Sequence, residues 1–469
     1  MFRFSLYYAR RYSGTYKEYM MFEAFFPKPK VFFGSFVLWS LACIILWFMF
    51  GQPLGEKLTL GELFGFVHLD YGALEALQEE ARSFGKHSSA EHVELVMEKI
   101  AAIKSATTFW FYQFLVPCYG IFLGFWHFFA KKEWRRWSLY GSALIVFVTW
   151  FQVQLDVMIN NWFGGFYDMV QKMFAEPGSI TPDEYYGRIF TFFSIAGIYV
   201  LVAILNRFFI QHFNFRWRTA LNERYTKLWE RVRHIEGSSQ RIQDDTMRFA
   251  DIMEGLGVGL IDSAMTLLAF LPLLWVLSTH VSELPIIGPI AHGLVIAAVI
   301  WSGLGTAILM LTGYYLPKLN FLNKRVEAAY REELVLGEKN LDRASPMTLQ
   351  RLFAHVRKNY FRLYFHYMYF NVARFTYLQA GALVPYVTLA PTLLSKEAIV
   401  AGFTLGVMQQ TVRAFGRVES SFQYLVLNYP TIIEMLSIYM RLRTFEAAIY
   451  NKPLPKIDQA YLDGTERNN

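Results

Sequence analysis

Repeated runs of about 20 predominantly apolar residues are the feature that most constrains this chain. A helix of that length crosses the roughly 30 Å hydrocarbon core of a bilayer, and inside hydrocarbon the backbone must satisfy its own hydrogen bonds. Hydrophobic residues make up 54% of the chain, which is high for a soluble domain. The sequence therefore predicts an all-α, multi-spanning membrane protein with about eight transmembrane helices. The predicted spans lie near residues 31–50, 109–130, 139–163, 189–210, 257–279, 288–316, 364–389 and, more weakly, 398–415.

Lysine and arginine concentrate in alternate connecting segments, which the positive-inside rule assigns to the cytoplasm. The N-terminal segment 1–30 and "KKEWRR" at 131–136 are basic, whereas the segment 51–108 carries more acids than bases. We therefore expect residues 31–446 to form a transmembrane domain with an external segment at 51–108. The N-terminal segment and the tail 447–469 are then both cytoplasmic. This topology accounts for the net charge of +7 without a nucleic-acid partner.

Two charged segments connect predicted spans and have helical periodicity. In the first, an apolar residue recurs every three or four positions, which indicates one face of a helix; these residues are Leu221, Tyr225, Leu228, Val232 and Ile235. We expect this helix to end at Gly237. The second segment, "NKRVEAAYREELVLGEKN", is expected to stop near Gly337. The membrane helices are thus predicted to continue as long cytoplasmic extensions, and the external segment 73–105 is also predicted to be helical.

Several motifs carry a family resemblance: "FFPKPKVFF", "FRWRTALNERY", "RHIEGSSQRIQDDTMRF", "HVSELPIIG", "KRVEAAYREELV" and "VRKNYFRLYFHYMYFN". Over about 22–446 the chain resembles the SbmA/BacA family of bacterial inner-membrane peptide transporters. "WRTALN" and "QRIQDD" are also similar to the membrane half of peroxisomal-type ABC transporters. The resemblance implies a homodimer with an ABC-exporter-like transmembrane domain, which imports antimicrobial peptides, microcins and bleomycin-like glycopeptides. It also implies that the proton gradient drives this import.

Exporter-like transmembrane helices usually work with an ATPase, which would need a nucleotide-binding motif. A phosphate-binding loop needs G-x-x-x-x-G-K-[ST], and the one Gly-Lys pair, Gly85-Lys86, lacks the upstream glycine and is followed by histidine. Few residues follow the last predicted span. We therefore expect a secondary active transporter rather than an enzyme, without an ATPase subunit, a metal or another cofactor, and with protons as the coupling ion. Peptides and membrane lipids are its expected partners.

Two other functions stay open at this point. One is a membrane subunit that recruits a separate ATPase, or that carries another cargo such as a vitamin. The other is a scaffold in envelope-lipid assembly.

Acidic residues in or near the membrane are the candidates for proton coupling, because burial or a neighbouring anion favours the neutral form of a carboxyl group. Glu254 lies in "DIMEGLGVG" where a charged segment re-enters the membrane, and Asp251 precedes it by one helical turn. The resemblance implies that Glu254 matches an essential acid. The alternative is an ordinary interfacial charge.

Three further acids are candidates for proton coupling. Glu327 and Glu338 are spaced to share one helix face, and the resemblance implicates both in transport. Alternatively, Glu327 forms an ordinary surface pair with Arg331 at i,i+4. Asp244 matches an acid of the family pattern. Because it adjoins Asp245, the two must point in different directions, and a capping role is the alternative.

A substrate cavity is predicted from polar and aromatic residues in the spans. Gln152, Asp156 and Asn160 form an i, i+4, i+8 stripe, which must face either a water-filled cavity or another helix. In the aromatic-rich seventh span, His366 and Arg374 are expected to line the cavity, or else to belong to an interfacial belt. The resemblance places Phe270 near the cavity, with plain core packing as the alternative.

Overall fold

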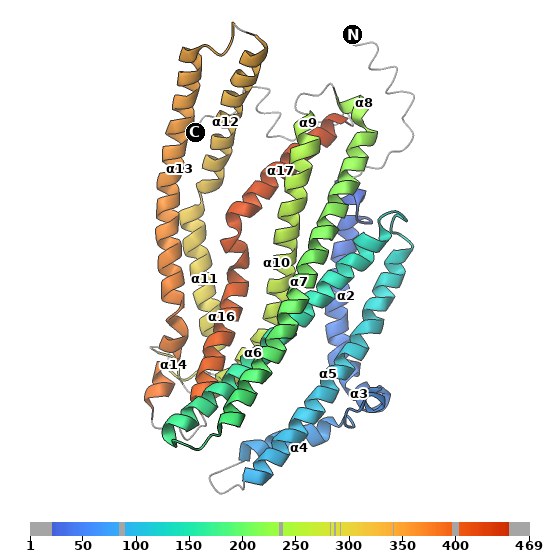
Figure 1. Cartoon of the computed structure of the whole chain (residues 1–469), viewed down its shortest axis with the longest axis vertical. Coiled ribbons are helices and arrows are strands. Elements are labelled where there is room, and N and C mark those ends of the chain that lie inside the picture. Colours follow the sequence, from blue (N-terminus) through green and yellow to red (C-terminus); the bar gives the residue numbers. More distant parts are fainter. Residues whose placement is uncertain are drawn as a thin grey trace. The chain divides into compact units, whose positions relative to one another are not determined.

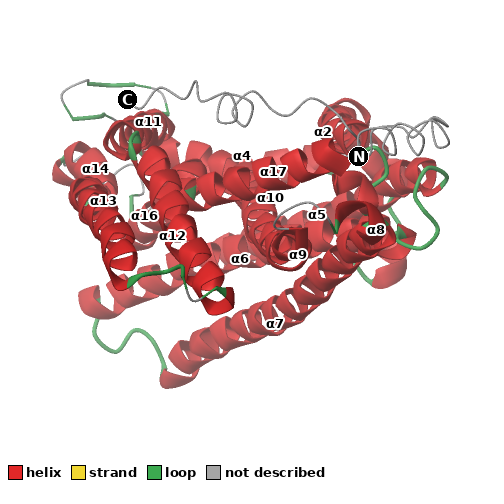
Figure 2. Cartoon of the chain, turned by 90° about the horizontal axis from the view of Figure 1, so that it is seen from above, coloured by secondary structure: helices red, strands yellow, loops and turns green. Residues whose placement is uncertain are grey.

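A computed structural model describes residues 21–83, 90–233, 238–281, 283–285, 288–290, 292–340, 342–395 and 403–449. Within these ranges the regular structure is helical, apart from an isolated bridge between Leu284 and Gly288 (Figures 1 and 2). The all-α prediction is therefore confirmed. Most of the predicted N-terminal segment, nearly all of the predicted tail, and Gly237 lie outside the described residues.

Helices long and apolar enough to cross a membrane correspond to the first seven predicted spans. In the described part of the chain they are Pro29–Leu58, Glu98–His127, Arg136–Ala175, Pro182–Lys227, Ser238–Leu277, Gly293–Gly313 and Pro346–Leu394. The eighth predicted span overlaps α16 (Leu405–Leu427), which is not among them. That helix carries Arg413, Arg417 and Glu419, whose charges lower its hydropathy. A multi-spanning membrane protein is nevertheless established.

The chain divides into two compact units, and the first covers Met1–Ser142. Its helical elements are a 3-10 turn (Met21–Ala24), α2 (Pro29–Leu46), a π-helical turn (Trp47–Gly51), α3 (Gln52–Leu58), a second 3-10 turn (Gly61–Phe64), α4 (Tyr71–Ser83), α5 (Ala90–His127) and a second π-helical turn (Arg136–Gly141). Helix α4 packs against α5. The indole Nε1 of Trp110 on α5 donates to the carbonyl oxygen of Gly51 at 2.7 Å. The helical prediction for 73–105 is confirmed for its described residues, which α4 and α5 cover, and α5 runs unbroken into the second predicted span.

The second unit, Ala143–Asn469, contains the remaining helices. They are α6 (Ser142–Ala175), α7 (Pro182–Lys227), α8 (Trp229–Val232), α9 (Ser238–Gln240), the π-helical turn Arg241–Asp245, α10 (Thr246–Leu277), a 3-10 turn (Ser278–His280), α11 (Gly293–Gly313), α12 (Leu316–Lys339), α13 (Pro346–Gly381), α14 (Val384–Leu394), α16 and α17 (Tyr429–Ile449). Helices α10, α11 and α16 pack together. Phe270, Leu274, Leu294 and Phe415 are fully buried between them, so burial of large apolar side chains holds this unit together.

The first charged extension ends differently from the prediction, whereas the second ends near Gly337 as predicted. Helix α7 ends at Lys227 and Leu228 leaves helical geometry, so the expected continuous helix up to Gly237 is wrong. Helix α12 passes through Gly337 and ends at Lys339. A Cβ at Gly337 would collide with the side chain of Ala344. This glycine therefore permits close packing of the α12–α13 hairpin, the yellow and orange pair in Figure 1, rather than ending a helix.

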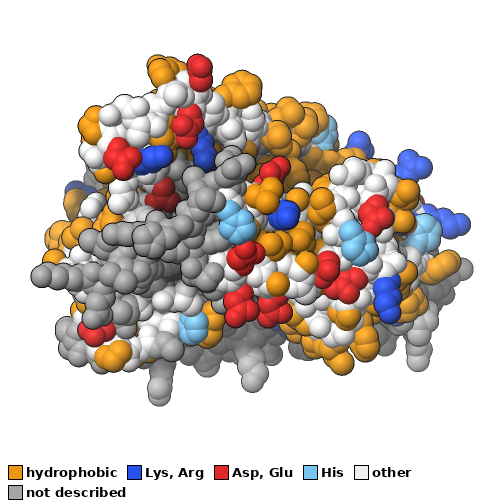
Figure 3. All heavy atoms as spheres, turned by 90° about the horizontal axis from the view of Figure 1, so that it is seen from below, with side chains coloured by type: hydrophobic (Ala, Val, Ile, Leu, Met, Phe, Trp, Pro, Cys, Tyr) orange, Lys and Arg blue, Asp and Glu red, His pale blue; other side chains and the backbone are white. Residues whose placement is uncertain are grey.

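One face of the molecule shows acidic and histidine side chains among hydrophobic ones (Figure 3). Within the predicted external segment, His68 lies 2.6 Å from Glu62 and His92 lies 2.8 Å from Glu80. All four side chains are largely exposed. Such surface pairs contribute little to stability, because water and salt screen them.

Candidate functional site

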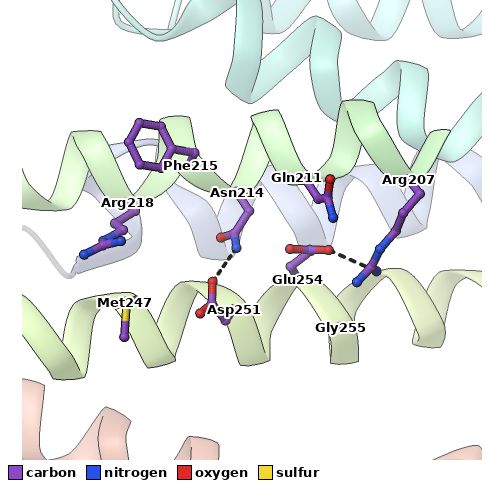
Figure 4. Close-up of a pocket in the computed structure, with 9 residues that line it drawn as sticks. All are labelled: Arg207, Gln211, Asn214, Phe215, Arg218, Met247, Asp251, Glu254 and Gly255. Atoms are coloured by element: carbon purple, nitrogen blue, oxygen red, sulfur yellow. Dashed lines mark hydrogen bonds and ion pairs between the residues drawn. The ribbon is translucent and has the colours of Figure 1, made fainter. Parts of the chain in front are cut away.

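A cavity of about 410 Å³ lies between α7 and α10, within the second unit (Figure 4). Its lining is mostly polar and comprises Arg207, Gln211, Asn214, Phe215, Arg218, Met247, Asp251, Glu254 and Gly255. The two helices pack side by side, and each presents residues spaced three or four apart, which share a helix face. Two acids from α10 and two arginines from α7 thus line the same cavity.

Glu254 is the more shielded member of an ion pair across this cavity. Its Oε1 lies 3.4 Å from Nη1 of Arg207, and its side chain is 11% exposed, against 69% for the arginine. The long contact and the exposed guanidinium make this a weak, screened pair. Such a pair can open without leaving a buried cation behind, because Arg207 reaches water.

Asp251 lies one turn before Glu254 and is held by an uncharged donor. The amide Nδ2 of Asn214 donates to its Oδ1 at 2.7 Å. Figure 4 shows both acids of α10 directed towards α7, with Arg218 at the other end of the cavity from Arg207. The cavity can therefore hold a positively charged group or a proton beside two carboxyl groups that lie one turn apart.

The glycines after Glu254 let another helix brace this part of α10. A Cβ at Gly259 would collide with the phenol of Tyr424 on α16. The Tyr424 hydroxyl lies 3.2 Å from the carbonyl oxygens of both Gly255 and Leu256, to which it can donate. The glycine-rich motif therefore fixes the backbone next to the shielded carboxylate.

Asp244 lies outside the cavity and forms an ion pair with its own helix. Its Oδ1 lies 3.0 Å from Nε of Arg248, at i,i+4. The adjacent Asp245 is almost fully buried and lies 2.7 Å from Arg441 on α17. The two acids contact different partners, as expected for side chains that point in different directions. The contact of Asp244 is an ion pair and not the helix cap that was the alternative, and Asp245 at the N-cap position of α10 makes no side-chain cap hydrogen bond.

Glu327 and Glu338 lie on α12, which packs against α13, and neither lines the α7–α10 cavity. Glu327 is partly exposed and Glu338 is exposed. Glu327 and Arg331 are both described, and no ion pair joins them. The structure therefore separates these two glutamates from Glu254 within one chain, and it does not form the surface pair that was the alternative.

The polar stripe of α6 faces other helices. Gln152 accepts a hydrogen bond from Asn206 on α7 at 2.8 Å. Asp156 is held by two guanidiniums of α16, with 3.1 Å to Arg413 and 2.7 Å to Arg417. Asn160 is fully buried, and its amide atoms have no hydrogen-bond partner among the described residues. Of the two predicted surroundings, contact with neighbouring helices is observed for Gln152 and Asp156.

The three remaining cavity candidates lie apart from the α7–α10 site. Phe270 is fully buried in the core between α10, α11 and α16, which favours the packing alternative. His366 on α13 stacks on Tyr315 with ring centroids 6.0 Å apart. Arg374 is half-buried, and its Nε has no hydrogen-bond partner in the part of the chain that the structure describes.

Sequence reasoning missed several polar residues that the structure brings into contact with the candidates. Arg207 and Asn214 belong to a helix predicted only as a span and stalk, although both recur on the face that carries Arg218. Arg413, Arg417 and Glu419 fall near or beyond the predicted end of the eighth span. The i,i+4 spacing of the two arginines was a signal of a shared anionic partner on another helix.

Comparison with known proteins gives a family. The sequence pattern of the SbmA/BacA-like family matches residues 131–450. Two uncharacterized ABC transporter ATP-binding proteins of Haemophilus influenzae are similar to the chain. One is 24% identical over 59% of this chain and 48% of its own length. The other is 25% identical over 41% of this chain and 33% of its own length. An uncharacterized ABC transporter ATP-binding protein of Synechocystis sp. is 24% identical over 59% of this chain and 43% of its own length.

The chain spans less than half the length of these relatives. Their names describe ATP-binding proteins, whereas the family match covers most of the membrane-spanning helices of this chain. The match includes the cavity between α7 and α10, the α12–α13 hairpin and α16. This chain therefore belongs to the SbmA/BacA-like family of membrane transporters.

Proposed function

We propose that this protein imports peptides across the bacterial inner membrane, that the proton gradient drives the import, and that it works as a homodimer with both termini in the cytoplasm. The observation that carries the proposal is the carboxylate of Glu254, shielded in a cavity between two membrane-crossing helices and paired only weakly with Arg207. Ionisable groups within membrane helices are costly, and they mark proton or substrate pathways in transporters.

The proposed coupling step uses the contact between Glu254 and Arg207. A proton that binds the carboxylate neutralises it and removes its attraction for the guanidinium. Arg207 then reaches water from α7, so the electrostatic contact between α7 and α10 is lost. Release of the proton on the other side restores the contact. A proton shifts the populations of two conformations when it binds one of them more tightly than the other.

The proposed cargo fits one carboxylate of the cavity and the aromatic character of α13. Asp251 accepts from the uncharged Asn214 and forms no ion pair with an arginine of the cavity in the described residues, which suits a cationic group of a peptide. Phe361, Tyr364, Phe365 and Tyr369 are exposed along α13 and provide surfaces for apolar and proline side chains. Removal of Asp251 is therefore expected to weaken uptake of cationic peptides more than uptake of neutral ones.

A second candidate function is a membrane subunit that works with a separate ATPase. The similarity to ABC transporter ATP-binding proteins favours it. The two functions differ in their energy source. The test is uptake of a fluorescein-labelled proline- and arginine-rich peptide by the purified protein in liposomes. Uptake that needs an imposed pH gradient and ignores nucleotide supports the proposal, whereas uptake that needs ATP and survives collapse of the gradient refutes it.

A further inference from the structure

Glu419 on α16 is a carboxylate bound by uncharged donors from three helices. Its Oε1 accepts from the indole Nε1 of Trp301 at 2.8 Å and from the amide Nε2 of Gln423 at 2.8 Å. The hydroxyl of Tyr377 lies 3.3 Å from the same oxygen. Trp301 belongs to α11 and Tyr377 to α13, and both lie in helices apolar enough to cross a membrane. All these donors meet one of the two carboxylate oxygens.

The surrounding helices are shaped to fit this group. The rings of Trp301 and Tyr377 stack with centroids 5.0 Å apart and planes 15° from parallel. A Cβ at Gly305 would collide with the Tyr377 ring, and a Cβ at Gly381 would lie 2.8 Å from Oε1 of Glu419. The absence of two side chains thus permits both the ring stack and the approach of the carboxylate.

Other acids on neighbouring elements form ion pairs with arginines, whereas Glu419 accepts from uncharged donors. Asp156 lies between Arg413 and Arg417, Asp245 contacts Arg441, and Glu254 contacts Arg207. Protonation of Asp156 would leave two guanidiniums without their anion, which is strongly unfavourable in a partly buried setting. Glu419 can take up a proton without breaking any described ion pair.

On α10 and α17, which pack against α16, the ion pairs and hydrogen bonds recorded for charged groups lie away from Glu419. On α10, Arg248 pairs with Asp244, Asp251 accepts from Asn214, and Asp262 faces Arg417. On α17, Glu434 lies 3.8 Å from Arg248 and Glu446 lies 3.1 Å from Arg224. Tyr377 is the titratable group that faces Glu419 from α13. The environment of Glu419 is therefore set by neutral hydrogen bonds.

Tyr377 gives this group two alternative hydrogen-bonding states. Its hydroxyl lies 3.3 Å from Oε1 of Glu419 and also 3.3 Å from the carbonyl oxygen of Trp301. A hydroxyl has one hydrogen, so it donates to one of these oxygens at a time. The amide of Gln423 contacts both the Tyr377 hydroxyl and Glu419. A change in the charge of the carboxyl group therefore changes which helix Tyr377 binds.

We propose that Glu419 is a second proton-binding group of the transporter, which takes the proton on Oε2 while Oε1 keeps its donors from α11 and α16. This inference rests on the proposed proton-driven function and extends it to a site separate from Glu254. The bound proton releases the Tyr377 hydroxyl to the Trp301 carbonyl and loosens α16 from α13. Protonation is thus linked to movement of α16, which also braces α10 beside Glu254 through Tyr424.

The test is infrared difference spectroscopy of the purified protein across a pH titration. Wild type is expected to show a pH-dependent carboxyl stretching band that disappears in Glu419→Gln, persists in Glu419→Asp and shifts in frequency in Trp301→Phe, which removes one donor. Glu332→Gln, which changes an exposed acid on α12, serves as the matched control and should leave this band unchanged.

The outcomes separate this inference from the proposed function. A spectrum of Glu419→Gln identical to that of wild type across the titration overturns the proton site. If Glu419→Gln does not fold, an unshifted band in Trp301→Phe overturns it instead. If Glu419→Gln loses the band but peptide uptake by wild type does not depend on the pH gradient, the proton site stands and the proposed function is refuted. A lost band together with loss of gradient-driven uptake supports both.

Discussion

The shared ion pair of Asp156 makes a quantitative prediction about stability. Asp156→Asn keeps the volume of the side chain but removes the anion that Arg413 and Arg417 share. Breaking a buried pair by removal of one partner costs about 3–5 kcal/mol. Asp156 is 10% exposed, but the arginines are 33% and 41% exposed, so water partly solvates the guanidiniums that remain. We therefore expect a loss of about 2 kcal/mol in the free energy of unfolding, below the fully buried range.

A double-mutant cycle isolates this interaction. Arg417→Gln alone should cost less than Asp156→Asn, because Arg413 still neutralises the aspartate. In the double variant one of the two unpaired cations is gone. Its loss in the free energy of unfolding should therefore be about 1 kcal/mol smaller than the sum of the losses in the two single variants. Equilibrium unfolding in mixed detergent micelles measures the three values, with the exposed Asp342→Asn as a control. Additivity within about 0.5 kcal/mol would refute the shared ion pair as a source of stability.

Two further predictions concern the α12–α13 hairpin and α11. Hydrogen bonds from the guanidinium of Arg343 and the backbone N–H of Ala344 lower the pKa of Glu333; their stabilisation is therefore complete above the unfolded-state pKa and is lost as pH falls through the lower folded-state pKa. Hydrogen exchange at Ala344, corrected for its intrinsic rate, should thus rise on acidification, and should already be raised at neutral pH in Glu333→Gln; equal protection in both proteins would contradict this. On α11, Gly305→Ala should destabilise the protein because the new Cβ meets a tyrosine ring of α13, whereas Gly303→Ala meets open space and should not; equal thermal unfolding of the two variants would rule out this packing argument.

The transmembrane helices were predictable because hydrocarbon imposes a length and a composition on each of them. The exact residues at which the charged helices end could not be predicted from the sequence. Glycine marks helix ends because it tolerates left-handed geometry, but it also permits close packing, and the sequence does not separate these uses. At Gly337 the approach of Ala344 required the glycine, and the helix continued for two residues to Lys339.

The sequence predicted only one member of the Glu254–Arg207 ion pair. Glu254 stood out as an acid within an apolar, glycine-rich stretch, and the structure places it in a polar cavity. Its partner Arg207 did not stand out, because an arginine near the predicted cytoplasmic end of a span is ordinary under the positive-inside rule. Glu419 was missed for a related reason, since Arg413 and Arg417 lower the hydropathy of α16. Their charges are compensated by Asp156 of α6, which lies far away in the sequence.

The central claim, that Glu254 carries the coupled proton, is tested most directly by uptake into liposomes with an acidic exterior. Wild type, Glu254→Gln and the exposed-acid control Glu332→Gln are reconstituted at equal density, and accumulation of the labelled proline- and arginine-rich peptide is followed with and without the pH gradient. The account predicts that wild type and the control accumulate peptide only with the gradient, and that folded Glu254→Gln accumulates none. Gradient-driven accumulation by Glu254→Gln at the wild-type rate would contradict it.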